Sequence, residues 1–242
     1  VQGHGWAGWR GWPRPRRWLH SPVMSTSAPL RAAAVLFDLD GVLVDSGEGV
    51  ARAWRGWAPR YGLDPDEVIT VAQGRRSIDT IRELAPHADA EREAAELEDA
   101  EVGAAGSTRP YPGASELLQA LDGVPWAVVT SCTRRLASAR LTAAGLPLPP
   151  AFVTADEVSA GKPDPEGYLL GARRLGVPAD ACVVIEDAPA GVAAGRAAGA
   201  TVVAVATTHA ADELAEADLV VPRLADLCAT VADGTVEIRP AG

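Results

Sequence analysis

The chain has 242 residues, 48% of them hydrophobic and 22% charged, and its 22 basic and 32 acidic side chains give a net charge of −10. This apolar content excludes a disordered chain, and no run approaches the roughly 18 apolar residues of a membrane span. The acidic balance argues against a partner such as nucleic acid or an anionic membrane. Three cysteines without Cys-x-x-Cys spacing argue against a disulfide framework or structural zinc, so we expect a cytoplasmic protein.

The first 23 residues differ from the rest of the chain. They hold four of the seven tryptophans and four arginines, contain no acidic residue, and are interrupted by glycine and proline. Such a segment has no apolar period that would fold it. We expect residues 1–28 to form a disordered extension; the alternative is an arm rich in tryptophan and arginine that binds a partner.

From residue 32 onward, short apolar runs alternate with helical patterns. We expect strands at Ala33–Phe37, Trp126–Thr130, Ala151–Val153, Cys182–Ile185, Thr201–Ala206 and Leu219–Val221. We expect helices between them at Arg134–Ala144, Pro165–Leu175, Ala190–Ala198 and Ala210–Ala217. Near-continuous runs of Val, Ile, Leu and Ala are typical of buried parallel strands. The alternation predicts an α/β fold, a parallel sheet with helices on both faces and ligands at the carboxyl ends of the strands.

One long stretch after the first strand lacks any strand-like run. Residues 47–109 carry only helical patterns, at Val50–Tyr61, Asp66–Ala72, Ser77–Leu84 and Ala90–Val102, before another helix is expected at Ala114–Leu121. Insertions at strand ends commonly form lids over a site. We therefore predict a helical cap at 47–111 and a catalytic core made of 29–46 and 112–242.

The first strand ends in two aspartates. Asp38 and Asp40 are two residues apart, so both can point to the same side of the strand exit, and Gly41 lets the backbone turn sharply. Two carboxylates held this close repel each other unless a cation neutralises them. Oxygen ligands select a hard cation such as Mg²⁺.

Two later strand ends carry matching features. The strand at Cys182–Ile185 runs into Glu186 and Asp187, which could complete a magnesium site with Asp38. The strand at Trp126–Thr130 ends in Thr130 and Ser131, whose hydroxyl groups could bind phosphate oxygens. A Thr-Ser pair after a strand is more often a helix cap, so the support for a phosphate-binding role comes from the matching features at the other two strand ends.

Lys162 is the only lysine in a chain with 21 arginines, and it lies between Gly161 and Pro163. Its retention points to a position that needs a compact ammonium group rather than a planar guanidinium.

In this order along the chain, the four features resemble the motifs of the haloacid dehalogenase superfamily of phosphohydrolases. Asp38-x-Asp40-Gly41 with its DGVLVDS extension, Thr130, GKPDP around Lys162, and IEDAPAGVAAGRAAG around Glu186 and Asp187 carry the resemblance. The resemblance covers residues 32–221. It implies a modified Rossmann core, and the helical insert resembles the type I cap of subfamily I, in the β-phosphoglucomutase-like and sugar-phosphatase branch.

The resemblance also implies a mechanism. Asp38 would be the nucleophile that forms an aspartyl-phosphate, and Asp40 would protonate the leaving alkoxide and then act as base on water. Mg²⁺ would be held by Asp38, the backbone carbonyl of Asp40 and Asp187, with Glu186 nearby. Catalysis would therefore be metal-dependent hydrolysis of a small-molecule phosphate ester.

Further roles follow from the same resemblance. Lys162 and Thr130 would orient the transferring phosphoryl group, and Ser131 would supply an additional hydrogen-bond donor to the phosphate. In the predicted cap, Arg75 and Arg76 lie between two helical patterns, where either could contact the substrate. We expect a soluble monomer that binds neither nucleic acid nor a membrane.

Several alternative functions of the same family are disfavoured by the residues that are present or absent in this chain. A dehalogenase of this superfamily lacks the second aspartate, which is present here as Asp40, and a phosphonoacetaldehyde hydrolase needs a cap lysine, which is absent. A β-phosphoglucomutase carries a cap histidine where this chain has Val50. Hydrolysis of a sugar or polyol phosphate is therefore favoured over mutase activity. Phosphoglycolate remains an alternative substrate, and a non-catalytic binding module of the same fold is the alternative from another class.

Overall fold

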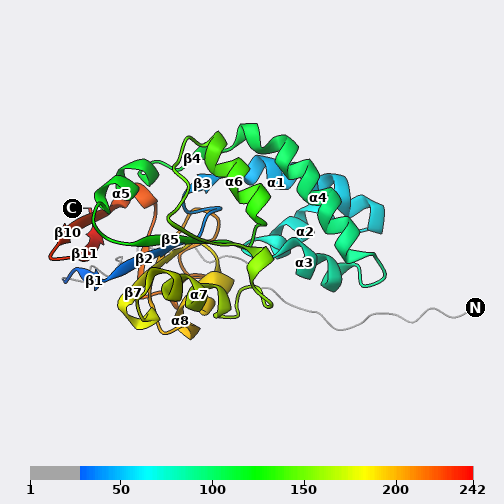
Figure 1. Ribbon diagram of the computed structural model, residues 1–242. Helices are drawn as coiled ribbons and strands as arrows, with labels where there is room; N and C mark the ends of the chain where they lie inside the picture. The colour runs from blue at the N-terminus through cyan, green and yellow to red at the C-terminus, as the bar shows by residue number, and fades with distance from the viewer. Residues whose placement is uncertain (1–27, 242) are drawn as a thin grey trace, which may run out of the picture.

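A six-stranded parallel sheet forms the centre of the fold (Figure 1) in this computed structural model, which describes residues 28–241. The strands are β2 (Ala34–Phe37), β5 (Trp126–Val129), β6 (Ala151–Val153), β7 (Cys182–Glu186), β8 (Thr201–Val205) and β9 (Leu219–Val221). All six predicted strands are present, and the α/β fold class is confirmed. The extension expected at residues 1–28 lies, apart from Ala28, outside the described residues.

The strand order of the sheet is β6-β5-β2-β7-β8-β9. The chain begins in the middle at β2, runs outward through β5 and β6, and then returns to build the other half from β7. Ligands of open α/β sheets bind where the strand order reverses in this way, here between β2 and β7. Phe37 pairs with Ile185 in these strands, so the residues that follow each strand emerge side by side.

Helices cover both faces of the sheet. They are α5 (Ala114–Ala120), α6 (Arg134–Ala143), α7 (Glu166–Leu175) and α8 (Pro189–Ala197). Because side chains alternate along a strand, Val35 and Phe37 of β2 pack in one core with α5 and α6, and Ala34 and Leu36 pack in a second core with α7 and α8. Both faces of the sheet are thus buried, as the apolar strand sequences predict.

A second, antiparallel sheet was not predicted from the sequence. It has the order β1-β11-β10 and consists of β1 (Leu30–Ala32), β10 (Leu227–Ala232) and β11 (Thr235–Pro240). Val236 and Ile238 of β11 are fully buried in the same core as α5 and α6. This sheet therefore ties the two ends of the described chain to the central fold.

Four helices form a separate group beyond one end of the central sheet (Figure 1). They are α1 (Gly47–Trp57), α2 (Pro65–Ala72), α3 (Ser77–Leu84) and α4 (Ala90–Ala104), and each corresponds to a predicted helical pattern. We call α1–α4 the helical insert. It has its own core around Trp54, Trp57 and Ile81. The chain enters and leaves it through a small antiparallel ribbon of β3 (Val44–Asp45) and β4 (Arg109–Pro110).

The helix predicted at Ala210–Ala217 is absent, so that prediction is wrong. The segment forms turns with hydrogen bonds between residues i and i+3, such as Glu213 N to Ala210 O. Only Leu214 is buried between Ala210 and Ala217, so the segment lacks the apolar face that stabilises a surface helix. After these turns Asp218 lies beside β8, where its backbone N–H donates to the Val202 carbonyl and its carboxylate accepts from the Val202 N–H.

The remaining helical segments are single 3₁₀ turns, at Ala58–Tyr61, Ala105–Ser107, Ala155–Glu157, Ala179–Ala181 and Leu224–Asp226. Among residues 28–241, no helix has the length and apolar character needed to cross a membrane.

Candidate active site

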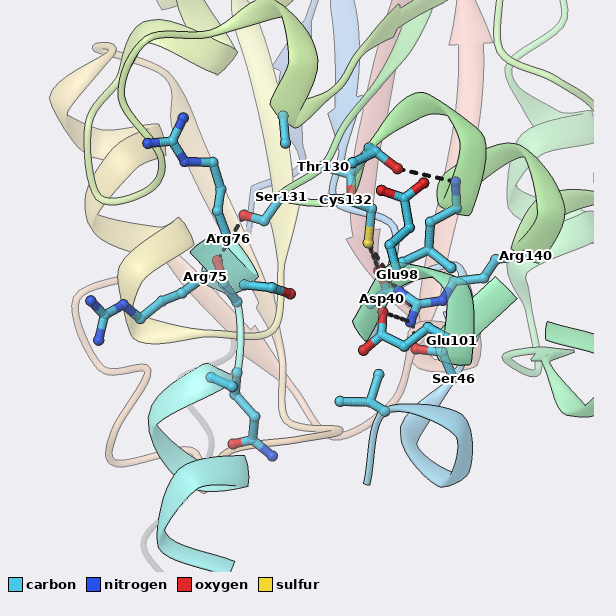
Figure 2. A pocket seen from close by; sticks show the side chains of 18 of the residues that line it. Asp40, Ser46, Arg75, Arg76, Glu98, Glu101, Thr130, Ser131, Cys132 and Arg140 are labelled. Atoms are coloured by element: carbon cyan, nitrogen blue, oxygen red, sulfur yellow. Dashed lines mark hydrogen bonds and ion pairs between the residues drawn. The ribbon is translucent and has the colours of Figure 1, made fainter. Parts of the chain in front are cut away.

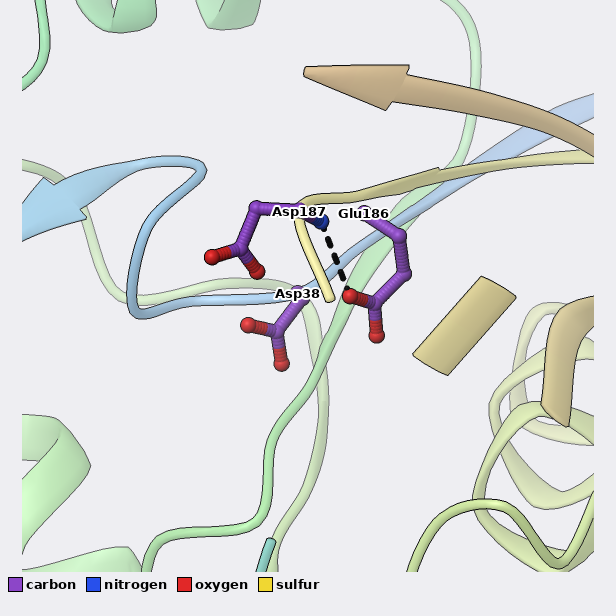
Figure 3. Close-up of side chains that lie close together, drawn as sticks. All are labelled: Asp38, Glu186 and Asp187. Atoms are coloured by element: carbon purple, nitrogen blue, oxygen red, sulfur yellow. Dashed lines mark hydrogen bonds between the residues drawn. The ribbon is translucent and has the colours of Figure 1, made fainter. Parts of the chain in front are cut away.

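Three buried carboxylates meet at the carboxyl edge of the central sheet (Figure 3). Asp38 follows β2, while Glu186 and Asp187 stand at the end of β7. One oxygen from each lies within 4.8 Å of the others. The strand order explains the meeting, because β2 and β7 are direct neighbours. The sequence motifs assigned these three residues to one site, and in the structure they form one cluster.

Lys162 reaches this cluster from the loop after β6. Its Nζ lies 2.5 Å from Oδ1 of Asp38 and 2.6 Å from Oε1 of Glu186. The hydroxyl of Tyr168 on α7 donates to the same Glu186 oxygen at 2.6 Å. The single lysine of the chain therefore holds two of the three carboxylates together.

The charges of the cluster are not balanced. Burial raises the pKa of Asp38 to about 7, although Lys162 opposes the shift. Burial, followed by the charges of Glu186 and Asp38, raises the pKa of Asp187 well above its usual value. Burial alone would lower the pKa of Lys162, but the two adjacent carboxylates raise it well above normal. Three buried carboxylates beside one ammonium group suit a hard divalent cation such as Mg²⁺.

Two glycines allow the carboxylates to be buried where they are. Gly41 has a φ of +83°, and a Cβ there would collide with the carboxylate of Asp187. A Cβ on Gly191, in the first turn of α8, would collide with the carboxylate of Glu186. Glu186 also accepts hydrogen bonds from the backbone N–H groups of Asp187 (2.9 Å) and Ala188 (3.3 Å). The turn after β7 is therefore shaped around the Glu186 side chain.

We expect Gly191→Ala to lower the free energy of unfolding by about 1–3 kcal/mol, because the added methyl group has no space beside Glu186. Gly56→Ala is a matched control, since Gly56 also lies in a helix but has open space around its Cα. That change should raise the free energy of unfolding by up to about 1 kcal/mol. Urea unfolding of both variants measures the difference. Equal stability of Gly191→Ala and wild type would contradict this account of the turn.

Asp40 has a different set of partners (Figure 2). Its Oδ1 accepts a hydrogen bond from Ser46 Oγ at 2.5 Å, and its Oδ2 lies 3.0 Å from Cys132 Sγ and 2.9 Å from Nη1 of Arg140. Asp40 is not one of the three clustered carboxylates. Its side chain instead faces α6 and the helical insert, and both of its oxygens are engaged.

Thr130 and Ser131 follow β5 and line the same cavity as Asp38. Thr130 is buried, and its Oγ1 accepts a hydrogen bond from the backbone of Cys132 at 3.1 Å. Ser131 Oγ donates to the carbonyl of Gly74 in the insert at 2.9 Å. The Ser131 hydroxyl group, predicted as a phosphate ligand, thus also connects the core to the insert.

Arg75 and Arg76 are the last two residues of the loop between α2 and α3, and both form ion pairs within the insert. Arg75 lies 2.6 Å from Glu83, and Arg76 makes two bonds to Asp79, at 2.6 and 3.1 Å. Arg76 also donates to the carbonyl of Val158 in the core at 3.2 Å. Both guanidinium groups therefore have carboxylate partners in this structure.

A cavity of about 570 Å³ lies between the core and the helical insert. Its core side includes Asp38, Asp40 and Thr130. Its insert side is part apolar and part charged, with Val50, Trp54, Ile69, Ile78, Arg75, Arg76, Arg82, Glu91, Glu98 and Glu101. Asp38 therefore lines a partly open cavity that is large enough for a small organic molecule.

Sequence reasoning missed several residues of this site. Thr208, after β8, donates a hydrogen bond from its hydroxyl group to Asp187. Arg140 on α6 and Glu101 on α4 are both buried and form an ion pair at 3.1 Å beside Asp40. Arg140 is one of three arginines in α6, and the other two, Arg134 and Arg135, are exposed, so residue type alone did not mark Arg140 as buried.

Comparison with known proteins places these observations in a family. The sequence model of the haloacid dehalogenase-like hydrolases matches residues 32–199. The chain is 45% identical over 206 residues to hexitol phosphatase A of Escherichia coli (strain K12), covering 83% of this chain and 95% of that one. It is 39% identical to glycerol-1-phosphate phosphohydrolase 2 of Saccharomyces cerevisiae, covering 77% of this chain and 80% of the relative.

A solved structure supports the same placement. The fold matches a hydrolase from Pseudomonas syringae with a TM-score of 0.73 and 30% identity, covering 80% of this chain and 94% of that one. Together with the matched residues and the conserved fold, these similarities show that the chain belongs to the haloacid dehalogenase-like hydrolases.

Proposed function

We propose that this protein is a Mg²⁺-dependent phosphatase that hydrolyses a small sugar or polyol phosphate through an aspartyl-phosphate. The observation that carries the proposal is the cluster of three buried carboxylates beside Lys162, of which Asp38 and Asp187 line the cavity. The relatives named above are phosphatases, which agrees with this chemistry. In this proposal the helical insert acts as a cap over the site.

Asp38 acts as the nucleophile. One of its carboxylate oxygens forms a bond to phosphorus while the bond from phosphorus to the substrate oxygen breaks. Asp40 gives a proton to the departing oxygen, and its carboxylate then takes a proton from a water molecule. That water attacks phosphorus, releases inorganic phosphate and restores Asp38.

The other side chains stabilise the transferring group. Mg²⁺ held by Asp38, Asp187 and Glu186 would supply positive charge to the phosphoryl oxygens. Lys162 adds a second positive charge from its position 2.5 Å from Asp38, and it keeps the nucleophile in place. Thr130 supplies a hydroxyl group beside the same carboxylate edge.

The charges of the cavity favour a neutral substrate body. Among the described residues, four arginines line the cavity, and each is paired with a carboxylate. The pairs are Arg75–Glu83 at 2.6 Å, Arg76–Asp79 at 2.6 Å, Arg82–Glu91 at 2.7 Å and Arg140–Asp40 at 2.9 Å. A second anionic group on the substrate would have to share a guanidinium group whose charge a carboxylate already balances, whereas Glu98 on the cavity wall can accept hydrogen bonds from hydroxyl groups.

A substrate panel tests this function. We expect kcat/KM for glycerol 1-phosphate and a hexitol phosphate to exceed that for phosphoglycolate by at least about tenfold, since a buried unpaired carboxylate costs more than about 1.4 kcal/mol. Release of inorganic phosphate is the measurement. Preference for phosphoglycolate would contradict the argument from charge. Conversion of β-glucose 1-phosphate to glucose 6-phosphate without phosphate release would show a mutase instead.

A further inference from the structure

We propose that Arg140 is a positioning residue for Asp40, and that Glu101 of the helical insert holds Arg140 in place. The inference rests on the proposed function, in which Asp40 transfers protons. It assigns a role to a buried ion network that lies outside the three-carboxylate cluster.

The geometry of Arg140 joins two parts of the molecule. Its guanidinium group, 3% exposed, lies between Asp40 of the core and Glu101 of α4 in the insert. Nη1 is 2.9 Å from Asp40 Oδ2, and Nη2 is 3.1 Å from Glu101 Oε2. Figure 2 shows the three side chains side by side. A planar guanidinium group presents N–H donors to two carboxylates in one plane and so fixes their relative orientation, whereas an ammonium group acts as a point charge with freely rotating donors.

The burial of this network needs an explanation. Removing an arginine and a glutamate from water costs free energy, and well-packed apolar residues often stabilise such a position equally well. The side chains of Glu101 and Arg140 are 5% and 3% exposed, so water does not stabilise either charge. The network is therefore better explained by the orientation it imposes on Asp40 than by its contribution to stability.

The carboxylate of Asp40 is fixed from three directions. Ser46, which precedes α1, holds Oδ1, while Cys132 from the loop after β5 and Arg140 from α6 hold Oδ2. Proton transfer to the substrate oxygen requires a defined direction and distance between donor and acceptor. Without Arg140, the carboxyl group of Asp40 loses the ion pair that fixes Oδ2. The insert takes part in this alignment through Glu101.

The leaving group of the substrate separates this role from a structural one. Glycerol 1-phosphate has a poor leaving group that needs a proton, whereas p-nitrophenyl phosphate releases a stable phenolate and needs none. For Arg140→Met we expect kcat/KM to fall by about 10²-fold with glycerol 1-phosphate, a typical acid–base contribution. With p-nitrophenyl phosphate, kcat/KM should change less than about threefold. A burst of nitrophenolate should appear, because hydrolysis of the aspartyl-phosphate also needs Asp40.

Two further variants and a control complete the experiment. Arg140→Lys keeps the charge but has a shorter side chain without the planar pair of donors, and Glu101→Gln removes the charged partner in the insert. Both should show the same substrate-dependent loss, to a smaller extent. Arg135→Met is the matched control, because Arg135 joins the same two helices through Asp99 at 2.6 Å on the surface. It should behave as wild type with both substrates.

The outcomes are distinguishable. Equal losses with both substrates, or no loss in any variant, would overturn the positioning role. If Arg140→Met does not fold, the ratio of the two substrates in Arg140→Lys and Glu101→Gln decides the question. Asp38→Asn should be inactive with both substrates, and activity in that variant would show that the proposed function itself has failed.

Discussion

Asp38→Asn is expected to lower phosphate release by on the order of 10⁴-fold or more, because the amide cannot replace the carboxylate as nucleophile. The variant keeps the size of the side chain and should remain folded. Its loss should be the same for every phosphate ester, since the nucleophile serves all substrates. The rate of phosphate release at saturating substrate measures the effect.

A matched control separates chemistry from charge. Asp122→Asn removes one carboxylate from the exposed loop between α5 and β5, and should keep wild-type turnover. Mass spectrometry of wild type mixed with substrate and quenched in acid should find phosphate on the peptide that contains Asp38. Turnover by Asp38→Asn within tenfold of wild type would rule out the aspartyl-phosphate mechanism.

Removal of divalent metal should have an effect of similar size. We expect a chelator to lower turnover by at least about 10³-fold and added Mg²⁺ to restore it, because the metal supplies positive charge that balances the carboxylates and the phosphoryl oxygens. Mg²⁺ should also raise the melting temperature of wild type, and the increase should continue with the logarithm of the Mg²⁺ concentration after the site is saturated. Asp187→Asn should lose both effects. Turnover that resists the chelator would contradict the magnesium site.

The metal-free protein provides a second readout for the same site. The pKa of Asp38 is raised to about 7 in the folded protein, from an unperturbed value of 3.8. The folded state then holds a proton that the unfolded state has lost, so stability should fall as pH rises between these two values. Mg²⁺ should remove this dependence on pH by stabilising the ionised form. Asp38→Asn, which has no carboxyl group to titrate, provides the comparison.

Much of the fold follows from local pattern. The six central strands are short apolar runs between helical patterns, and burial on both faces leaves no other arrangement for such runs. Asp38, Thr130, Glu186 and Asp187 could be expected near one another because they lie at strand ends, and parallel strands end at one edge of a sheet, whereas Lys162 lies in a longer loop and was identified through the motif resemblance. The grouping of Asp38, Glu186 and Asp187 therefore follows from the sequence once the strand order is known.

The antiparallel sheet could have been predicted from a signal that was overlooked. Asp233 and Gly234 separate β10 from β11, and both have positive φ angles, 51° and 71°. An Asp-Gly pair between alternating apolar residues is a strong signal for a hairpin. The segment was missed because β10 and β11 carry alternating polar residues rather than continuous apolar runs.

The network around Asp40 could not be predicted in this way. Arg140 looks like any helical arginine in the sequence, and its burial depends on how α6 packs against α4. Glu101 is one of many acidic residues in an acidic helix. Their pairing joins residues 39 positions apart and two separate groups of helices. Such a contact depends on tertiary packing, which no local pattern encodes.

The ribbon of β3 and β4 has a consequence for how this architecture can diversify. The chain leaves the core at Val44–Asp45 and returns at Arg109–Pro110, and these two crossings are paired with each other. Everything between them has its own apolar core around Trp54 and Trp57. Such a segment can be exchanged or remodelled as one module without changing the register of the parallel sheet. The carboxylate cluster of the core and the insert side of the cavity can therefore change independently of each other, in evolution or by engineering.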